Sequence, residues 1–373
     1  MEPIWAITRF MNQATFWFFS LVNKFIITMV RSTNKSPKKI NMNKDFAEQT
    51  PLISVILPTY NRAHLMPRAV QSVLNQTYKN FELIIVDDGS NDHTPEIAKA
   101  FNDQRIVYVR HKENKGVTAS YNTGLRLARG KYVAFLGDDD ELLSDALKTV
   151  INKFDEISLK TGEVGCLFFD CIKAETGETA GLGLRKGFIS YRDWLCGVVR
   201  GNYWGVINRQ EISPDELKFD ENVYANEIIF WLKLLRKYRF YYIPLPLYIA
   251  YGKHGGERLS EFRTILKHLP KAVQGMKILL EEFGREMENL CPKHYGECLK
   301  SLGLYLLLDN NISEGREILR RSLLYKFSIE SLVLLIMSHI LSSKQLSLVI
   351  TEFSEIKNKL RSIINSRCIF SMW

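Results

Sequence analysis

Short apolar runs alternate with longer amphipathic stretches in the part of the chain that follows residue 50. The runs are ISVIL (53–57), FELIIV (81–86), RIVYV (105–109) and KYVAFL (131–136). Uninterrupted apolar runs of this length suit strands that are covered on both faces. Strands that alternate with helices predict an α/β fold, in which a mostly parallel, Rossmann-like sheet is flanked by helices.

The stretches between the runs carry helix signals. Thr94 and Pro95 have the order of an N-cap followed by a first-turn proline. The next stretch spans about 117–129 and ends at Gly130, a common C-terminal stop. We therefore expect helices between the strands.

Polar clusters follow three of the four predicted strands. They are TYNR (59–62), DDGS (87–90) and GDDD (137–140). The carboxyl ends of strands in an open parallel sheet lie along one edge, where ligands bind. We therefore expect the three clusters to converge on one crevice.

The third cluster places Asp138, Asp139 and Asp140 side by side. Adjacent like charges are unfavourable unless water or a cation offsets them. Carboxylate oxygens are hard ligands that suit Mg²⁺ or Mn²⁺, and such an ion could neutralise charge on a diphosphate leaving group. The alternative is that these are solvated loop acids that cap the next helix.

Composition narrows the partners without choosing among them. The chain has 373 residues and a net charge of +9, which suits an anionic partner such as nucleotide phosphate, acidic lipid or nucleic acid. It contains neither a GxGxxG nor a GxxxxGK[ST] phosphate loop, and no aromatic platform along a basic groove supports nucleic-acid binding. Six cysteines show neither a CxxC pair nor a disulfide-framework spacing, so we expect reduced thiols in a cytosolic compartment.

Residues 1–34 are apolar and aromatic but are interrupted by charges. Their helical spacing and basic excess fit a helix that lies on an anionic membrane surface, and the charges make a spanning helix unfavourable. The alternatives are a helix packed on the protein body, or an upstream extension of a chain that starts at Met42. Residues 35–50 are polar and aperiodic, which indicates a linker.

Residues 261–373 lack strand signals and predict a helical C-terminal domain. Residues 298–328 resemble a tetratricopeptide-like helical hairpin with its turn at DNNIS. The run SLVLLIMSHIL (331–341) is too short to span a bilayer. We expect a buried helix there, with membrane contact as the alternative.

The motifs together resemble a known family. SVILPTYNR, SVLNQTYKNFELIIVDDGSNDHT and NKGVTASYNTGLRLARGKYVAFLGDDDELL look like the nucleotide-binding half of the GT-A, family 2 glycosyltransferases. The resemblance has no gap over residues 53–143 and is weaker beyond them. It implies a GT-A domain over 51–260, with a nucleotide-binding half at 51–143 and an acceptor-binding half at 144–260.

The resemblance also implies roles for single residues. Asp88 would accept a hydrogen bond from the base, commonly uracil, and Asp87 would help to hold that loop or the ribose. Asp139 matches the metal-binding acid of the family's DxD motif, Asp138 would lie near the ribose and the metal, and Gly137 replaces the first acid of the motif. The other residues expected to border the nucleotide-sugar are Pro58, Tyr60, Asn61 and Arg62.

For the chemistry, the resemblance implies an inverting transfer, which needs a general base to take the proton of the acceptor hydroxyl. The family usually carries an acidic ED pair at the start of a helix, and the matching stretch is ANEIIFWLKLL (225–235). Glu227 falls at the position of the base, with Asn226 before it. The alternative is a surface glutamate that caps this helix.

A glycine-rich stretch, YGKHGGERLS (251–260), predicts a mobile loop that closes over the diphosphate. Arg258 offers a planar fork for phosphate, and His254 is expected to complete the metal shell, with a solvent-facing histidine as the alternative. Trp204 is expected to border the acceptor pocket, with aromatic core packing as the alternative. Tyr121 stands where the family more often has arginine.

The leading hypothesis is a metal-dependent (Mn²⁺ or Mg²⁺), inverting glycosyltransferase that uses a UDP-sugar and a glycan or lipid-linked acceptor. Its expected setting is cell-surface polysaccharide synthesis on the cytosolic face of a membrane, with peripheral contact through residues 1–34. The competing hypothesis is a catalytically silent sugar-nucleotide-binding domain whose helical C-terminus binds a protein. Gly137, Tyr121 and Glu227 depart from the family pattern and keep this alternative open, whereas the three retained carboxylates favour the enzyme: Asp88, Asp139 and Glu227.

Overall fold

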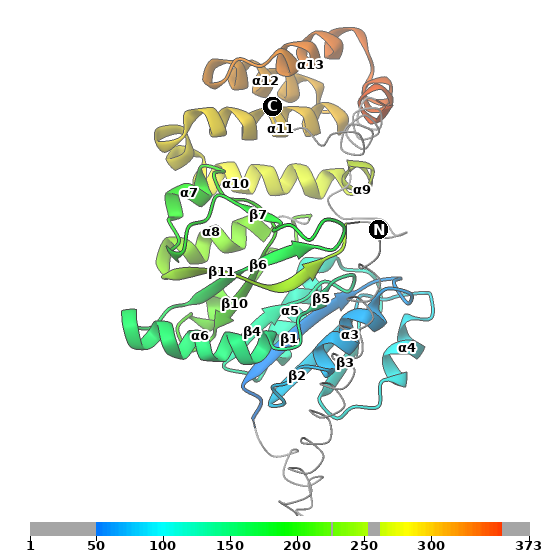
Figure 1. The fold of residues 1–373 in the computed structure, drawn as a ribbon. Coiled ribbons are helices and arrows are strands. Elements are labelled where there is room, and N and C mark those ends of the chain that lie inside the picture. Colours follow the sequence, from blue (N-terminus) through cyan, green and yellow to red (C-terminus); the bar gives the residue numbers. More distant parts are fainter. Residues whose placement is uncertain (1–49, 225–226, 253–261, 353–373) are drawn as a thin grey trace, which may run out of the picture. The chain divides into compact units, whose positions relative to one another are not determined.

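The structure is a computed structural model that describes residues 50–224, 227–252 and 262–352 (Figure 1). The predicted helix at 1–34 and nearly all of the linker lie outside the described residues. No helix within the described ranges combines the length and the hydropathy needed to cross a bilayer.

The four predicted strands are present and form the first half of one sheet. They are β1 (Ile53–Thr59), β2 (Phe81–Asp87), β3 (Ile106–Arg110) and β4 (Tyr132–Phe135). Their spatial order is β3-β2-β1-β4, and every pair among them is parallel. The predicted parallel α/β arrangement is therefore confirmed for this half.

The second half continues the same sheet but mixes the strand directions. Antiparallel β10 (Tyr203–Asn208) lies between β4 and β6 (Cys166–Lys173), and β11 (Phe240–Ala250) runs parallel to β6. The short strands β5 (Glu141–Leu142) and β8 (Gly187–Phe188) each pair with β11 in antiparallel fashion. A separate two-stranded ribbon is formed by β7 (Gly181–Leu182) and β9 (Arg200–Gly201).

Helices cover both faces of the sheet, as the apolar runs predict. Val55 and Leu57 of β1 face one apolar cluster, whereas Ile56 between them faces the other. The first cluster contains side chains of α3 (Met66–Leu74), α4 (Thr94–Ala100) and α6 (Ala146–Thr161). The second contains side chains of α5 (Val117–Leu127) and α8 (Glu227–Lys237).

The start of α4 differs from the expected cap. Thr94 is the first residue of the helix and His93 is the N-cap, without a side-chain cap bond. Instead, the Oδ1 atom of Asp92 accepts hydrogen bonds from the backbone N–H and the hydroxyl of Thr94, at 3.0 and 2.6 Å. The prediction of Thr94 as the cap is therefore wrong by one residue, because Asp92 supplies the acceptor from outside the helix.

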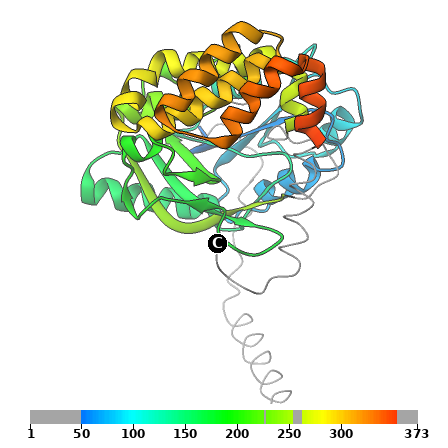
Figure 2. The same ribbon diagram turned by 90° about the horizontal axis from the view of Figure 1, so that it is seen from above.

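The C-terminal part is helical throughout the described residues 262–352. Its elements are α9 (Phe262–Lys267), α10 (Leu269–Leu290), α11 (Pro292–Leu308), α12 (Ile312–Tyr325) and α13 (Ile329–Ile340). The predicted hairpin is present as α11 and α12. Figures 1 and 2 show these helices stacked on one side of the sheet domain, with α10 nearest to it.

Two connections join the helical layer to the rest of the fold. Leu279 and Phe283 of α10 pack with Leu232 of α8 and with Leu195 of α7 (Tyr191–Leu195). The 3₁₀ turn η1 (Pro214–Glu216) precedes α8 in the chain.

A disulfide joins the same elements, and it corrects the expectation of reduced cysteines. Cys196, directly after α7, is bonded to Cys291, directly before α11. The two lie 95 residues apart, and the packing of the helical layer brings their Cα atoms to 5.5 Å, so no local spacing motif announces the pair. Cys166, Cys171 and Cys298 are free and buried, and the remaining cysteine, Cys368, lies outside the described residues.

Candidate active site

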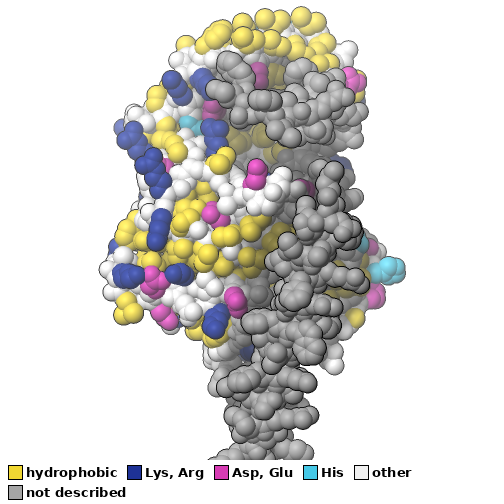
Figure 3. Space-filling view, viewed as in Figure 1, with side chains coloured by type: hydrophobic (Ala, Val, Ile, Leu, Met, Phe, Trp, Pro, Cys, Tyr) yellow, Lys and Arg dark blue, Asp and Glu magenta, His cyan; other side chains and the backbone are white. Residues whose placement is uncertain are grey.

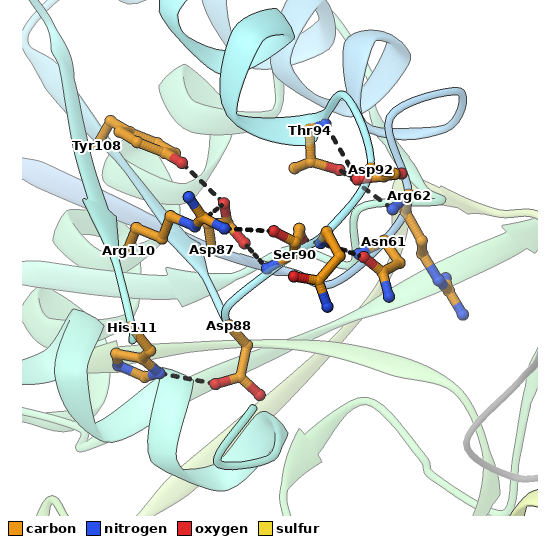
Figure 4. Close-up of polar contacts among 11 residues, drawn as sticks. Asn61, Arg62, Asp87, Asp88, Ser90, Asp92, Thr94, Tyr108, Arg110 and His111 are labelled. Carbon is orange, nitrogen blue, oxygen red and sulfur yellow. Dashed lines mark hydrogen bonds and ion pairs between the residues drawn. The ribbon is translucent and has the colours of Figure 1, made fainter. Parts of the chain in front are cut away.

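The three polar clusters meet at the carboxyl ends of β1, β2 and β4, as predicted. The backbone N–H of Asn61 donates to the Ser90 hydroxyl at 2.8 Å, and the Asn61 side-chain oxygen accepts from the N–H of Asn91 at 2.7 Å. Figure 4 shows how these contacts tie the loop after β1 to the loop after β2. Arg62 then reaches the third cluster, where it contacts Asp138 and Asp139.

The loop after β1 is fixed by its neighbours and leaves one aromatic ring exposed. The N–H groups of Arg62 and Ala63 donate to Thr94 Oγ1 and Asp92 Oδ2, at 3.2 and 3.0 Å. Asn61 has a positive φ of 52°, and Tyr60 before it is 40 % exposed. Pro58 at the end of β1 is half-buried. The expected base-and-ribose border is therefore a rigid backbone that presents Tyr60.

Asp87 is wholly buried and holds the loop that follows β2. Its Oδ1 accepts from the N–H of Ser90 at 2.8 Å. Its Oδ2 accepts from the Tyr108 hydroxyl at 2.7 Å and lies 3.5 Å from Arg110 Nε (Figure 4). Of the two roles expected for Asp87, this geometry matches that of a loop-holding carboxylate.

Asp88 is also buried and organises a second loop. It accepts from the backbone N–H of Lys115 and Gly116 at 2.9 and 2.7 Å, and it lies 2.7 Å from His111 Nδ1. The other ring nitrogen of His111 is 2.9 Å from the Thr123 hydroxyl. No sequence pattern predicted a role for His111, because its link to Asp88 spans 23 residues and depends on the parallel pairing of β2 with β3.

The aspartate triplet divides into two parts. Asp138 and Asp139 face Arg62, whose Nη1 lies 3.0 Å from Asp138 Oδ1 and 2.8 Å from Asp139 Oδ2. Asp140 turns instead to β11 and the residues after it, where it accepts from the Tyr248 hydroxyl and from the N–H of Tyr251. The pair that faces Arg62 is therefore Asp138 and Asp139.

Burial is the largest influence on the pKa values of Asp138 and Asp140. It raises the pKa of Asp138 to about 6, although the charge of Arg62 acts in the opposite direction. Burial and the neighbouring charge of Asp139 raise the pKa of Asp140 to about 6 as well. A cation beside these buried carboxylates would stabilise their ionised forms and lower their pKa values.

The carboxylate oxygens of Asp138 and Asp139 suit a divalent cation whose remaining ligands come from a bound substrate. Within the described ranges no group of three or more His, Cys, Asp or Glu side chains could hold a metal by itself. Asp138 and Asp139 offer hard oxygens, and Mg²⁺ is commonly held by one or two carboxylates plus substrate phosphates. A guanidinium already stands between these two carboxylates, which shows that a cation has room there.

Gly137 suits this arrangement. A Cβ atom at this position would lie 2.7 Å from Asp140 Oδ2 and 2.9 Å from Asp139 Oδ1. A larger residue, such as the aspartate at this point of the family's motif, would therefore require the following carboxylates to move.

Arg68, which the sequence analysis missed, lies beside the triplet. Its guanidinium is 3.5 Å above the Tyr251 ring and donates to the backbone carbonyl of Asp139. Its Nε is buried and has no hydrogen-bond partner among the described residues. An orphaned guanidinium donor beside two carboxylates is suited to a phosphate oxygen.

A cavity of about 430 Å³ adjoins the triplet and extends along β6 and β10. Its walls are mostly aromatic, with Asp140 and Glu227 as the acidic groups. Trp204 lines it, as expected, and its indole N–H donates to the Phe135 carbonyl at 2.9 Å. The other aromatic residues in the walls are Tyr121, Phe135, Phe168, Trp194, Tyr203, Phe219, Trp231 and Tyr248.

Glu227 is the first residue of α8 and lines this cavity. Burial raises its pKa above the ordinary value of 4.5. A desolvated carboxylate next to a cavity is a stronger base than an exposed one, which is what proton abstraction needs. Asn226, His254 and Arg258 lie outside the described residues, so their expected roles stay predictions.

Tyr121 and Asn122 were not expected to join the two halves of the domain. The Tyr121 ring contacts Phe135 and Phe219 at centroid distances of 4.8 and 5.1 Å. Burial raises the Tyr121 pKa, and the charge of Glu227 adds to the effect, so the hydroxyl stays neutral. Asn122 donates to the Phe219 carbonyl at 2.9 Å and accepts from its N–H at 2.8 Å.

Comparison with known proteins agrees with the motifs. The family model described as glycosyl transferase family 2 matches residues 54–160. A GalNAc(5)-diNAcBac-PP-undecaprenol β-1,3-glucosyltransferase from Campylobacter jejuni is 31 % identical over 304 residues, which is 77 % of this chain and 93 % of the relative. A UDP-Glc:α-D-GlcNAc-diphosphoundecaprenol β-1,3-glucosyltransferase from Escherichia coli is 30 % identical over 189 residues, 50 % of this chain and 70 % of the relative.

A solved structure shows the same fold. The crystal structure of S. aureus TarS 1–349 in complex with UDP-GlcNAc aligns with a TM-score of 0.56 at 18 % identity. The alignment covers 81 % of this chain and 91 % of that chain. The similarity therefore includes part of the C-terminal helical region as well as the sheet.

Proposed function

Because the chain belongs to glycosyltransferase family 2 and is a glycosyltransferase with a GT-A fold, we propose that it moves a sugar from UDP to a hydroxyl of a lipid-linked glycan, with inversion and with a divalent metal. The main observation behind the proposal is that a pair of aspartates and an aromatic cavity lie next to each other. Asp138 and Asp139 face Arg62 at the shared edge of β1, β2 and β4, and the aromatic cavity with Glu227 opens beside them.

The donor half supports a nucleoside diphosphate. The fixed loop after β1 presents the exposed Tyr60 to a base or ribose, and Asp88 lies at the root of the neighbouring loop. Arg62 and Arg68 are placed for the diphosphate, since each has donors directed at the triplet region. Mn²⁺ or Mg²⁺, when bound by Asp139 and Asp138, would neutralise charge on the UDP leaving group.

The acceptor half supports a base-assisted attack. Glu227 takes the proton of the acceptor hydroxyl, the hydroxyl oxygen forms a bond to the anomeric carbon, and the bond from that carbon to the UDP oxygen breaks. The raised pKa of Glu227 strengthens it as a base. The aromatic walls, including Trp194, Tyr203 and Trp231, suit the apolar faces of sugar rings and exclude water.

The acceptor class is proposed from the relatives. Both named β-1,3-glucosyltransferases act on sugars linked to undecaprenol through a diphosphate, a single GlcNAc for the E. coli relative. The Campylobacter relative is matched over 93 % of its length. This places the proposed reaction in the synthesis of cell-surface glycans. We further propose that the enzyme works at the cytosolic face of a membrane, with residues 1–34 as one candidate contact.

The test is a transfer assay with membrane lipid extract as acceptor source and a panel of UDP-sugars as donors. We expect UDP release with one donor, dependence on Mn²⁺ or Mg²⁺, and a product whose anomeric configuration, read by NMR, is opposite to that of the donor. Glu227→Gln should lower the rate of UDP release by about 10²-fold or more, whereas Glu281→Gln on the exposed side of α10 should leave it unchanged. A product that retains the donor configuration would contradict the role of Glu227.

A further inference from the structure

Helix α13 exposes an apolar face that nothing in the described residues covers. Ile329, Ile336 and Ile340 are 71 %, 53 % and 74 % exposed, and Leu332 and Val333 between them are 38 % and 44 % exposed. Exposed apolar side chains continue before and after the helix, at Leu324, Phe327, Leu348 and Val349. Figure 3 shows hydrophobic side chains gathered along the end of the molecule formed by α12 and α13. We call these nine residues the α13 face.

The opposite side of α13 is packed, so the helix is apolar on both sides. Leu334, Leu335 and Met337 belong to the cluster around Leu307 of α11 and Leu319 of α12. A helix that is apolar all round is normally buried on all sides, in a core or in lipid. The sequence prediction of a buried helix is therefore right for one side of α13 only, and the exposed side needs a cover.

The charge around the α13 face is basic. Exposed Arg320 and Arg321 precede it on α12, and exposed Lys344 follows it. Between residues 316 and 352 the basic residues outnumber the acidic ones: Arg316, Arg320, Arg321, Lys326 and Lys344 stand against Glu317, Glu330 and Glu352.

We propose that the α13 face binds a membrane surface that carries anionic lipid, and so holds the enzyme on the bilayer that contains its acceptor. An apolar face with Lys and Arg at its rim is the signature of interfacial binding, since the apolar side chains enter the headgroup boundary and the basic ones meet lipid phosphates. The part of this inference that concerns the acceptor rests on the proposed function.

A second copy of the chain fits the α13 face less well. A two-fold contact places the same surface patch on both partners. Such a contact would bring exposed Arg320, Arg321 and Lys344 of one copy toward the same basic residues of the other. The one acidic residue of α13, Glu330, is already paired with Lys300. Anionic lipid supplies the opposite charge that such a contact lacks.

The position of α13 adds a geometric condition on the acceptor. α11 packs between α10 and α12, and α13 packs on α12. Packed helix axes are about 8–10 Å apart, so at least two helix layers separate the α13 face from α10. The sugar-bearing end of the acceptor must span this depth to reach the cavity at Glu227.

Vesicle co-sedimentation of the full chain tests the proposal in the absence of donor and acceptor, so the result does not depend on sugar transfer. We expect binding to phosphatidylcholine vesicles that contain phosphatidylglycerol and weaker binding to phosphatidylcholine alone. The double variant Ile336→Glu/Ile340→Glu should lower the partition coefficient about tenfold or more. The matched control is Leu159→Glu on α6, where an 88 % exposed leucine lies outside the helical layer.

A local readout separates α13 from residues 1–34, which are a second candidate for lipid contact. The photoreactive residue p-benzoylphenylalanine, placed at position 336 in the full chain, should form adducts with lipid on irradiation with vesicles. Melting temperatures verify that each variant is folded. Equal partition of the double variant and the wild type, or cross-links to protein in place of lipid, would overturn the proposal.

Discussion

Single carboxylates of this chain have distinct tasks that their burial and contacts reveal. Asp87 and Asp88 hold loops through backbone N–H groups, whereas Asp138 and Asp139 face a guanidinium and Glu227 faces a cavity. A loop-holding acid and a chemical acid should therefore respond differently to neutralisation. We expect neutralisation of the first kind to lower stability, and neutralisation of the second kind to lower donor binding or turnover.

Glu227 provides the first prediction at the residue scale. Glu227→Gln keeps the size of the side chain but removes the base, so we expect kcat to fall by about 10²-fold or more. Donor binding, measured as stabilisation by UDP with Mn²⁺, should stay within about twofold of wild type because Glu227 lies on the acceptor side. A variant that loses UDP binding to the same degree as turnover would show that Glu227 is a donor-site residue.

The pH dependence follows from the same side chain. Burial raises the Glu227 pKa above 4.5, and only the ionised form accepts a proton. Activity should therefore fall as the pH drops through this raised pKa, with an acidic limb of kcat/KM above the ordinary glutamate value. A limb at or below 4.5, measured in a pH range where the protein stays folded, would contradict a buried base.

Arg62 gives a prediction for the metal. Its guanidinium occupies the space between Asp138 and Asp139, so a cation must compete with it. Arg62→Met should therefore tighten binding of Mn²⁺ alone about fivefold, measured as free Mn²⁺ by electron paramagnetic resonance. Arg285→Met, an exposed arginine of α10, is the matched control. Weaker or unchanged Mn²⁺ binding in Arg62→Met would show that the two cations do not share a site.

At the scale of elements, the apolar runs predicted the strands that build the donor half. Each of the strands β1 to β4 begins and ends within two residues of its predicted run. Short apolar runs bounded by polar clusters are typical of buried strands, so both the type and the bounds of these elements could be predicted. The same clusters predicted the candidate site, since a parallel sheet brings strand ends together. Contacts such as His111 with Asp88, or Asn122 with Phe219, depend on loop paths that have no periodicity to read.

The crossing of α11 and α12 depends on two glycines. A Cβ at Gly303 would lie 2.8 Å from Leu319 Cγ and 3.1 Å from the Gly315 carbonyl oxygen, so the two backbones approach closely. Gly303→Ala should lower the melting temperature by several degrees, consistent with about 1–3 kcal/mol of overpacking. Gly284→Ala on α10 is the control, since a Cβ at Gly284 would lie 3.4 Å from Tyr295 Cε2, an ordinary van der Waals contact.

If Gly303→Ala and Gly284→Ala melt at the same temperature, the close approach of α11 and α12 does not contribute to stability as described. Circular dichroism of both variants, recorded below their melting temperatures, would verify that their helical content is that of the wild type.

The disulfide gives a further prediction between elements. Cys196–Cys291 ties the end of α7 to the start of α11, so a reductant should lower the melting temperature of the wild type by an amount that corresponds to about 2–4 kcal/mol. Cys196→Ser should melt lower in oxidising buffer and lose its response to reductant. An equal response of both proteins to reductant would place the effect elsewhere in the chain.

At the scale of the whole molecule, composition had limited power. The spacing of six cysteines predicted free thiols, yet two of them pair because distant helices pack together. The run at 331–341 predicted a helix correctly, but the pattern could not show that one of its sides is left open, since that depends on how α11, α12 and α13 stack. Such long-range packing has no local sequence signal.

The most direct measurement for the central claim is thermal stabilisation of the full chain by UDP, GDP and CMP, each with Mn²⁺ or with chelator. We expect UDP with Mn²⁺ to raise the melting temperature, by an amount that corresponds to about 2.7 kcal/mol at a hundredfold excess over Kd. Asp139→Ala should abolish the shift, and Asp155→Ala on the exposed side of α6 should retain it. Absence of stabilisation by any of the three nucleotides, in a folded protein, would contradict a metal-dependent UDP-sugar site at the edge of β1, β2 and β4.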